Sequence, residues 1–227
     1  MKEIRIAPSI LAWDLGDLKR AVEISVKGGA DQVHLDVIDG HFAPNITFGP
    51  GTVKALRKLT DLKFDTHLMI EEPYRYADKF LEAGSDVLSV HAEVMNGPLF
   101  DELYRTVKSK GKDLGLAIKP STQLPEWAKE RLDKVSTLVV MTVNPGFSGQ
   151  TMDMSVMPKL ETMSRLVEGT GTDIEIDGGV EPDNVGEVVS RGGNVLVAGA
   201  GVYAKEDPVG AISVLRERAE DARRPRR

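Results

Sequence analysis

The 227-residue chain contains no cysteine, which excludes disulfide bonds and metal sites built on thiolates. Histidine and carboxylate side chains are therefore the metal ligands that the sequence offers. The chain also lacks an apolar run of about 18 residues and a basic leader followed by an apolar stretch, so we expect neither membrane insertion nor secretion, and a cytoplasmic location. A net charge of −6 leaves no excess of basic residues for nucleic acid or an anionic membrane, and we expect anions to be bound only locally.

Eight short runs rich in β-branched residues or leucine recur along the chain, each followed by a longer amphipathic or polar stretch. The runs are residues 4–11, 32–39, 62–70, 86–91, 114–119, 137–143, 173–177 and 195–199. Their spacing of about 20 to 40 residues suits a strand, a crossover helix and the next parallel strand. With 41% hydrophobic residues and no linker-like segment, the sequence predicts an α/β protein, a single (β/α)8 TIM barrel that forms one domain over residues 1–227.

The stretches between the runs carry helical periodicity, which predicts helices that cover the barrel. Apolar residues recur at near-helical intervals in the sets Leu15, Leu18, Val22, Val26 and Val209, Ile212, Leu215. A short basic tail at about residues 222–227 is expected to be a solvated, frayed terminus rather than a contact for an acidic partner.

Polar residues near the ends of the runs are candidates for chemistry, because the active site of a barrel lies at the carboxyl ends of its strands. His34 and Asp36 stand two apart in the second run, which places both side chains on one face of a strand. His67 lies near the end of the third run and Asp177 ends the seventh, so we expect the four side chains to converge. Each alone is explained as a satisfied hydrogen-bond partner, but four at strand ends favour a metal site. Their ligand types suit one divalent transition metal ion, Zn²⁺, Fe²⁺, Mn²⁺ or Co²⁺.

Glycine-rich segments follow the last three runs. They are Gly146-Phe147-Ser148-Gly149, Gly178-Gly179 and Gly199-Ala200-Gly201. Glycine lets the backbone approach an anion closely, and barrels often hold phosphate at this rim. Loop geometry alone explains one glycine pair, but three successive loops at one rim favour a phosphate site.

Five sequence blocks carry a resemblance that extends over almost the whole chain. They read IAPSIL from Ile6, HLDVIDGHFAPNITFGP from His34, DTHLMI from Asp65, MTVNPGFSGQ from Met141 and EIDGG from Glu175. With these blocks in this order, the chain resembles the ribulose-phosphate 3-epimerase family. The resemblance implies an isomerase that interconverts two small-molecule ketose phosphates, D-ribulose 5-phosphate and D-xylulose 5-phosphate, by epimerisation at C3.

The resemblance also implies a role for each site residue. Asp36 and Asp177 are the implied acid–base pair, since inversion at C3 needs a proton removed from one face and returned to the other. The implied metal ligands are His34, Asp36, His67 and Asp177. The implied substrate contacts are Ser9, His67, Met69, Met141, Gly146, Phe147, Ser148, Gly149, Gly178, Gly179, Gly199 and Ala200. On physical grounds alone, Ser9 suits the cap of a turn equally well, and the two methionines suit the core.

The chain departs from the family's usual pattern at several pocket positions. Ile38 stands where the family usually has Met, Ser148 where it has Gly, and Ala200 where it has Ser, while residues 151–157 are Met-rich where a Phe is expected. These departures bear on the identity of the sugar more than on the reaction type. His41 and His91 are expected to support the site from outside, His91 through a structural hydrogen bond.

Three other interpretations remain open. One is an epimerase of a related ketose phosphate such as D-allulose 6-phosphate. Another is a decarboxylase or lyase barrel, but such an enzyme is expected to place a lysine in the central cluster, and no lysine ends the second or third run. The third is a non-catalytic phosphosugar-binding barrel, which would need no paired acid and base. In each case we expect a homo-oligomer, since soluble enzymes commonly form one.

Overall fold

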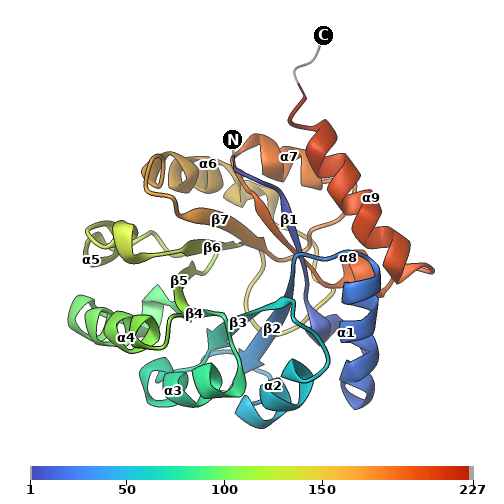
Figure 1. Ribbon diagram of the computed structural model, residues 1–227. Coiled ribbons are helices and arrows are strands. Elements are labelled where there is room, and N and C mark those ends of the chain that lie inside the picture. Colours follow the sequence, from blue (N-terminus) through green and yellow to red (C-terminus); the bar gives the residue numbers. More distant parts are fainter. Residues whose placement is uncertain (1, 225–227) are drawn as a thin grey trace.

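The computed structural model describes residues 2–224, and within them eight parallel strands pair in the order β1-β8-β7-β6-β5-β4-β3-β2 (Figure 1). The strands are β1 (Arg5–Pro8), β2 (Gln32–Ile38), β3 (Lys63–Met69), β4 (Val87–His91), β5 (Asp113–Ile118), β6 (Thr137–Met141), β7 (Asp173–Asp177) and β8 (Val195–Ala198). An isolated parallel bridge between Ser9 and His34 joins the two ends of this order and closes the sheet. The prediction of a (β/α)8 TIM barrel is confirmed, and each strand overlaps the run predicted for it.

Helices separate the strands and cover the outside of the barrel (Figure 1). They are α1 (Leu18–Lys27), α2 (Pro50–Arg57), α3 (Pro73–Ala83), α4 (Gly97–Ser109), α5 (Glu126–Lys129), α6 (Met157–Leu166), α7 (Val185–Ser190), α8 (Ala200–Tyr203) and α9 (Pro208–Asp221). Short 3-10 turns are η1 (Ile10–Ala12), η2 (Leu15–Asp17), η3 (Ala92–Val94), η4 (Leu132–Lys134) and η5 (Met154–Val156). The side chains of Asp17, Asn96 and Asp207 cap α1, α4 and α9 by accepting from first-turn backbone N–H groups.

The first predicted set of core-facing helical residues, Leu15, Leu18, Val22 and Val26, is confirmed for two of the four. Val22 is buried and Leu18 packs against the core, as expected of α1. Leu15 is 48% exposed and Val26 is 46% exposed. The reason for Leu15 is local, because it belongs to η2, a separate turn that Asp14 caps before α1 begins.

The second predicted stripe, on α9, is confirmed. Ile212 and Leu215 are buried and Val209 packs against the core. The helix ends at Asp221, and residues 222–224 form an exposed or half-exposed turn. The rest of the predicted basic tail, residues 225–227, lies outside the described residues.

Strand β2 illustrates how the barrel positions its polar residues. All seven of its residues are buried, because a parallel strand in a barrel is covered on both faces. Val33, Leu35 and Val37 pack in the main hydrophobic core, while His34 and Asp36 alternate with them and point to the other face. The barrel wall therefore holds these two polar side chains inside the barrel.

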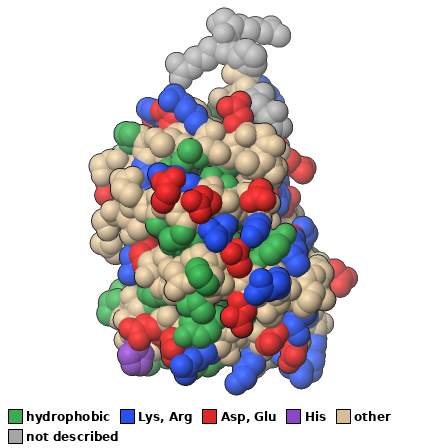
Figure 2. Space-filling model, turned by 90° about the vertical axis from the view of Figure 1, so that its left-hand side faces the viewer, with side chains coloured by type: hydrophobic (Ala, Val, Ile, Leu, Met, Phe, Trp, Pro, Cys, Tyr) green, Lys and Arg blue, Asp and Glu red, His purple; other side chains and the backbone are tan. Residues whose placement is uncertain are grey.

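The outer surface carries charges of both signs. Over the face formed by α3, α4 and α5, acidic and basic side chains are interspersed (Figure 2). Ion pairs join neighbouring helices there, as between Lys110 and Asp78 and between Arg131 and Asp101. Within residues 2–224, no helix has both the length and the apolar character needed to cross a membrane.

Candidate active site

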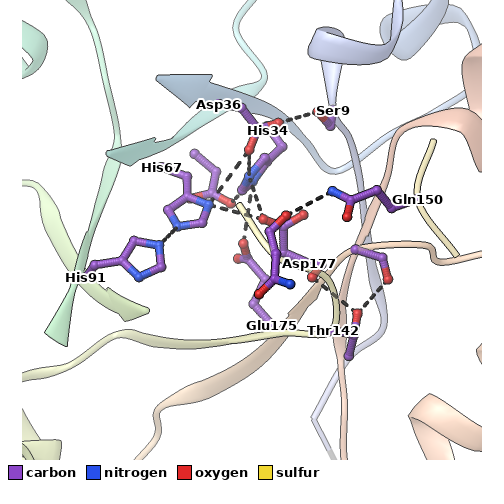
Figure 3. Close-up of polar contacts among 12 residues, drawn as sticks. Ser9, His34, Asp36, His67, His91, Thr142, Gln150, Glu175 and Asp177 are labelled. Atoms are coloured by element: carbon purple, nitrogen blue, oxygen red, sulfur yellow. Dashed lines mark hydrogen bonds and ion pairs between the residues drawn. The ribbon is translucent and has the colours of Figure 1, made fainter. Parts of the chain in front are cut away.

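Three strands each present two polar side chains to the barrel interior, two positions apart. The pairs are His34 and Asp36 on β2, Asp65 and His67 on β3, and Glu175 and Asp177 on β7. Figure 3 labels these side chains other than Asp65. Strand pairing aligns His34 with Asp65 and Asp36 with His67. The six side chains therefore form two layers, one nearer the carboxyl ends of the strands and one deeper in the barrel.

The predicted metal ligands come together at the carboxyl ends of the strands. His34 Nε2 lies 3.3 Å from Asp36 Oδ1 and 3.9 Å from Asp177 Oδ2. His67 Nδ1 lies 3.2 Å from Asp177 Oδ2 and 3.8 Å from Asp36 Oδ1. One ligand atom from each of the four buried residues lies within 4.8 Å of all the others.

This group fits a divalent cation on two observations. Among residues 2–224, His34 Nε2 has no hydrogen-bond partner although it is buried. Its Nδ1 lies 2.9 Å from Asp65 Oδ2, which fixes the ring so that Nε2 is left for another partner. Asp36 and Asp177 place two buried carboxylates beside that unpartnered nitrogen, and a bound cation would satisfy all three.

The charges in this group shift one another's pKa values. Burial by itself lowers the pKa of His34, but the carboxylates of Asp36 and Asp65 outweigh burial and raise it well above its usual value. Burial by itself raises the pKa of Asp36, but the His34 imidazole and the hydroxyl of Ser9 bring it below its usual value. The site thus favours a positive charge beside an ionised Asp36.

Two members of the deeper layer, Asp65 and Glu175, were not among the predicted site residues. Asp65 accepts hydrogen bonds from His34 and from Gln32 Nε2, the latter at 3.1 Å. Burial, reinforced by Asp65, raises the pKa of Glu175, whereas the His34 imidazole outweighs burial and lowers the pKa of Asp65. The signal for this layer was present in the sequence, because Asp65 and Glu175 each precede a predicted ligand by two positions.

His91 and Glu93 form a chain of contacts behind His67. His91 Nε2 lies 2.9 Å from His67 Nε2 (Figure 3). His91 Nδ1 lies 2.9 Å from Glu93 Oε2. Burial lowers the pKa of His91 to about 4. Burial alone raises the pKa of Glu93, but its hydrogen bond with His91 and further donors lower it to about 2. His41 instead lies on the exposed loop after β2, and it is not among the residues that line the cavity described next.

A cavity of about 210 Å³ opens beside this group of four side chains, with Asp36 and Asp177 in its lining. One wall is apolar, because Ile38, Met69 and Met141 pack there as a separate hydrophobic cluster. Ser9 donates its hydroxyl to Asp36 Oδ2 and also lines the cavity. The other predicted contacts in the lining are Gly146, Phe147, Ser148, Gly149, Gly178, Gly179, Gly199 and Ala200. His67 is fully buried beneath this lining and does not belong to it.

Another part of the lining is built from the predicted glycine loops. Gly178 and Gly179 have φ values of +123° and +64°, which side chains rarely adopt. A Cβ on Gly178 would lie 2.6 Å from Val143 Cγ2, and one on Gly179 would lie 2.4 Å from Met152 N. Glycine at these two positions is therefore required by the fold itself.

Several residues of the lining were not predicted. They are Leu11, Val143, Asn144, Pro145, Gln150, Thr151, Met152, Val180, Glu181, Asn184 and Val197. Most lie in the loops after β6 and β7, where side-chain direction depends on the loop path rather than on a strand period. Gln150, for example, is held by donating to the carbonyl oxygens of Asn144 and Phe147.

Solved structures share this fold at low sequence identity. The chain matches 3-hexulose-6-phosphate synthase from Salmonella typhimurium with a TM-score of 0.74 and 17% identity, covering 96% of this chain and 100% of that one. It matches 3-keto-L-gulonate-6-phosphate decarboxylase from Vibrio cholerae with a TM-score of 0.74 and 15% identity, covering 97% and 99%. At such identities the likeness concerns the fold alone.

Sequence relatives are more specific. The chain is 44% identical over 216 residues to the ribulose-phosphate 3-epimerase of Bacillus subtilis, covering 94% of this chain and 98% of that protein. It is 39% identical over 219 residues to the chloroplastic ribulose-5-phosphate-3-epimerase of Arabidopsis thaliana, covering 94% and 76%. Residues 5–203 match the family described as the ribulose-phosphate 3 epimerase family. With a family match over most of its length and relatives of this identity, the chain belongs to the ribulose-phosphate 3-epimerase family.

Proposed function

We propose that this protein is a metal-dependent 3-epimerase that interconverts D-ribulose 5-phosphate and D-xylulose 5-phosphate. The observation that carries the proposal is the position of two buried aspartates, Asp36 and Asp177, at one cavity between an imidazole pair and a glycine-lined wall. Family membership supports the reaction class, an epimerisation. We also propose a cytoplasmic homo-oligomer, which rests on the sequence expectations alone.

Four side chains of this protein would hold the metal ion: His34 through Nε2, His67 through Nδ1, and the carboxylates of Asp36 and Asp177. When bound, a divalent cation supplies electrostatic stabilisation for the negative charge that develops as the C3 proton leaves. Imidazole and carboxylate ligands are compatible with zinc, iron, manganese or cobalt in the divalent state.

The two aspartates are proposed as the acid and the base. Inversion next to a ketone needs one group to take the C3 proton from one face of the sugar and another to return a proton to the opposite face. Asp36 and Asp177 come from β2 and β7, which are separated by β1 and β8 around the barrel, and both line the cavity. Burial by itself raises the pKa of Asp36, but the neighbouring His34 imidazole outweighs burial and lowers it. The lowered pKa favours the ionised carboxylate, which is the form that accepts a proton.

Other residues position the substrate. Ser9 holds Asp36 through a hydrogen bond and is proposed to contact the sugar from the end of β1. Met69 and Met141, with Ile38, provide the apolar wall against which the carbon chain packs. The remaining predicted contacts are proposed to bind the phosphate: Gly146, Phe147, Ser148, Gly149, Gly178, Gly179, Gly199 and Ala200. Ala200 belongs to the first turn of α8, where backbone N–H groups have no intrahelical partner.

The proposal is tested by assaying the purified protein on several ketose phosphates and resolving the stereochemistry of the products by chromatography. We expect conversion of D-ribulose 5-phosphate to D-xylulose 5-phosphate and of the product back to the substrate. D-Allulose 6-phosphate is the informative comparison, since a higher kcat/KM with this hexulose phosphate would overturn the assigned substrate but not the reaction. No turnover of any ketose phosphate with metal-loaded protein would overturn the function itself.

A further inference from the structure

The side chains behind His67 connect it to the surface of the molecule. The contacts run from His67 on β3 to His91 at the end of β4 (Figure 3). From His91 they continue to Glu93 in η3. Both imidazoles are fully buried, whereas the Glu93 side chain is 18% exposed and its residue as a whole lies at the surface. None of the proton-transfer steps assigned to Asp36 and Asp177 uses this chain of contacts.

Glu93 sets which atoms donate and which accept along the chain of contacts from Glu93 through His91 to His67. Glu93 Oε1 accepts the backbone N–H of Lys119 at 2.8 Å, just beyond the end of β5. Its other oxygen faces His91 Nδ1 at 2.9 Å. An ionised carboxylate has acceptors and no donor, so His91 donates from Nδ1. Phe42, whose ring centroid lies 4.5 Å from that of His91, packs against the imidazole and holds it in place.

The contact between the two histidines then has one solution. The His91 and His67 Nε2 atoms are 2.9 Å apart, while the ring centroids are 5.0 Å apart and the planes differ by 16°, so the rings meet edge to edge. Such a contact holds a single proton between two nitrogens. Because a neutral His91 carries its proton on Nδ1, the shared proton belongs to His67 Nε2.

We infer that His91 and Glu93 are positioning residues that select the tautomer of His67 in which Nδ1 is free to bind the metal ion. With Nε2 protonated, the remaining lone pair of His67 lies on Nδ1, the atom 3.2 Å from Asp177 Oδ2. Two acceptors at this distance repel each other unless a cation or proton lies between them, which is the arrangement that a metal site requires. The inference rests on the metal site proposed above and extends it to two residues that touch neither the metal ligands' carboxylates nor the cavity.

The two imidazole ligands are supported in different ways. His34 donates from Nδ1 directly to Asp65, inside the barrel, and presents Nε2. His67 presents the opposite nitrogen, Nδ1, and its Nε2 is linked to a supporting carboxylate, that of Glu93, only through the imidazole of His91. Replacement of His91 should therefore impair His67 and leave the support of His34 intact.

The direct test is proton assignment by long-range ¹H–¹⁵N NMR on protein with ¹⁵N-labelled histidines, with chelator present and with Zn²⁺ added. We expect His67 protonated at Nε2 and His91 protonated at Nδ1 but not at Nε2 in both samples. A proton on His91 Nε2 with none on His67 Nε2 would overturn the inference. Because the metal-free sample reports the same protons, this result is readable even if the native protein binds no metal, an outcome that would contradict the proposed function instead.

Metal affinity provides the second measurement, using Co²⁺ alone in a calorimetric titration. His91→Phe keeps a ring but removes the acceptor, and we expect Co²⁺ affinity to fall about 10–100-fold, the usual cost of losing such a support. Glu93→Gln should lower the affinity by a smaller factor. Activity lost at limiting Co²⁺ should return as Co²⁺ is raised, whereas a substrate-binding defect would not respond to the metal.

Ser89→Ala is the matched control. Ser89 lies two positions before His91 on β4, is fully buried, and its hydroxyl has no hydrogen-bond partner among residues 2–224. This variant should bind Co²⁺ with native affinity. Native affinity in His91→Phe, or an equal loss in Ser89→Ala, would show that β4 contributes packing rather than tautomer selection.

Discussion

The two halves of the barrel mouth differ in what lines them, strand side chains in one half and loop backbone in the other. The half formed by β2, β3 and the end of β7 uses side chains fixed on strands, and its imidazole and carboxylate groups are fully or almost fully buried. The half formed by the loops after β6, β7 and β8 uses glycine-rich backbone, and part of it is exposed, as at Phe147. A site that needs defined proton donors and acceptors depends on residue identity, whereas a site that surrounds an anion depends on the path of the backbone.

The difference is visible in what supports each half. In the side-chain half, His34 and His67 each have a hydrogen-bond partner at the ring nitrogen that does not face Asp36 and Asp177. In the glycine half, the loops hold one another, as where Asn45 Nδ2 donates to the carbonyl oxygen of Gly146 at 2.7 Å. We therefore expect the largest losses of activity from changes in the side-chain half and graded losses from the glycine half.

Removal of the metal is expected to have the largest effect. Chelator treatment should abolish epimerisation, since the charge that develops at the substrate would lose its main stabilisation, and a divalent transition metal should restore it. Activity is to be measured beside elemental analysis of the same samples. Full activity in protein shown to be free of metal would contradict the proposed metal site and the larger effect expected of the side-chain half.

Replacement of either aspartate should come next. Asp36→Asn or Asp177→Asn is expected to lower the epimerisation rate by about 10²- to 10⁴-fold, the usual contribution of a positioned acid or base. In D₂O, one epimer should still exchange its C3 hydrogen through the surviving carboxylate, which NMR on each epimer separately will detect. Because both residues are also proposed ligands, metal content must be measured in each variant. A metal-replete variant that interconverts the epimers at the native rate would refute the two-base assignment.

Removal of the phosphate tests the glycine half as a whole. Hydrogen bonds from backbone N–H groups to a charged phosphate contribute about 1.5–3 kcal/mol each, so two of them correspond to at least about 100-fold. We expect kcat/KM for D-ribulose to be lower than that for D-ribulose 5-phosphate by this factor or more. Equal values for the two ketoses would mean that the glycine loops serve only the fold.

A single substitution in the glycine half should have a moderate effect. A Cβ on Gly199 would lie 3.1 Å from Ala12 Cβ and 4.0 Å from Ser148 Cβ, within the cavity wall. We expect Gly199→Ala to raise KM for D-ribulose 5-phosphate by about tenfold, or about 1.4 kcal/mol, with a smaller change in kcat. Gly51→Ala on α2 is the matched control, because its added Cβ would meet no atom within 4 Å. An unchanged KM in Gly199→Ala would argue against anion binding at this loop.

Substitution of Gly178 is a poor test of anion binding, although the sequence places Gly178 in a predicted phosphate loop as it does Gly199. A side chain there would strain a φ of +123° and would overlap Val143, so its replacement tests stability before it tests binding. The melting temperature of a Gly178→Ala variant should fall below that of Gly199→Ala. The reverse order in thermal unfolding would contradict this distinction.

The apolar wall should tolerate substitution best. Ile38→Met restores the residue that the family usually carries, packed against Met69 and Met141. Swaps that keep volume and apolar character cost less than about 1.5 kcal/mol, so kcat/KM should change by less than about tenfold. Steady-state kinetics on both the pentulose and the hexulose phosphate will check this, and a larger change would show that position 38 selects the substrate.

How much the sequence revealed depends on the element. The strands were predictable because a buried parallel strand produces a continuous apolar run, and Asp173–Asp177 was predicted with the bounds that the structure has. The convergence of His34, Asp36, His67 and Asp177 was predictable from residue type, position at strand ends and, for the first two, the strand period of two. The start of α1 was not, since Leu15 keeps the helical spacing while a capped turn separates it from the helix.

By itself, the sequence of this protein determined which side chains reach the barrel interior and which of them carry imidazole or carboxylate. The alternation of side chains along a strand is a local property, so the spacing of His34 and Asp36 predicts that they share one face whatever the fold. Only the tertiary structure decided that Glu93 stands behind His91, that His91 faces His67, and that Asp65 and Glu175 form a second buried layer. These contacts join different strands, and their existence depends on the register and closure of the barrel, which no local pattern specifies.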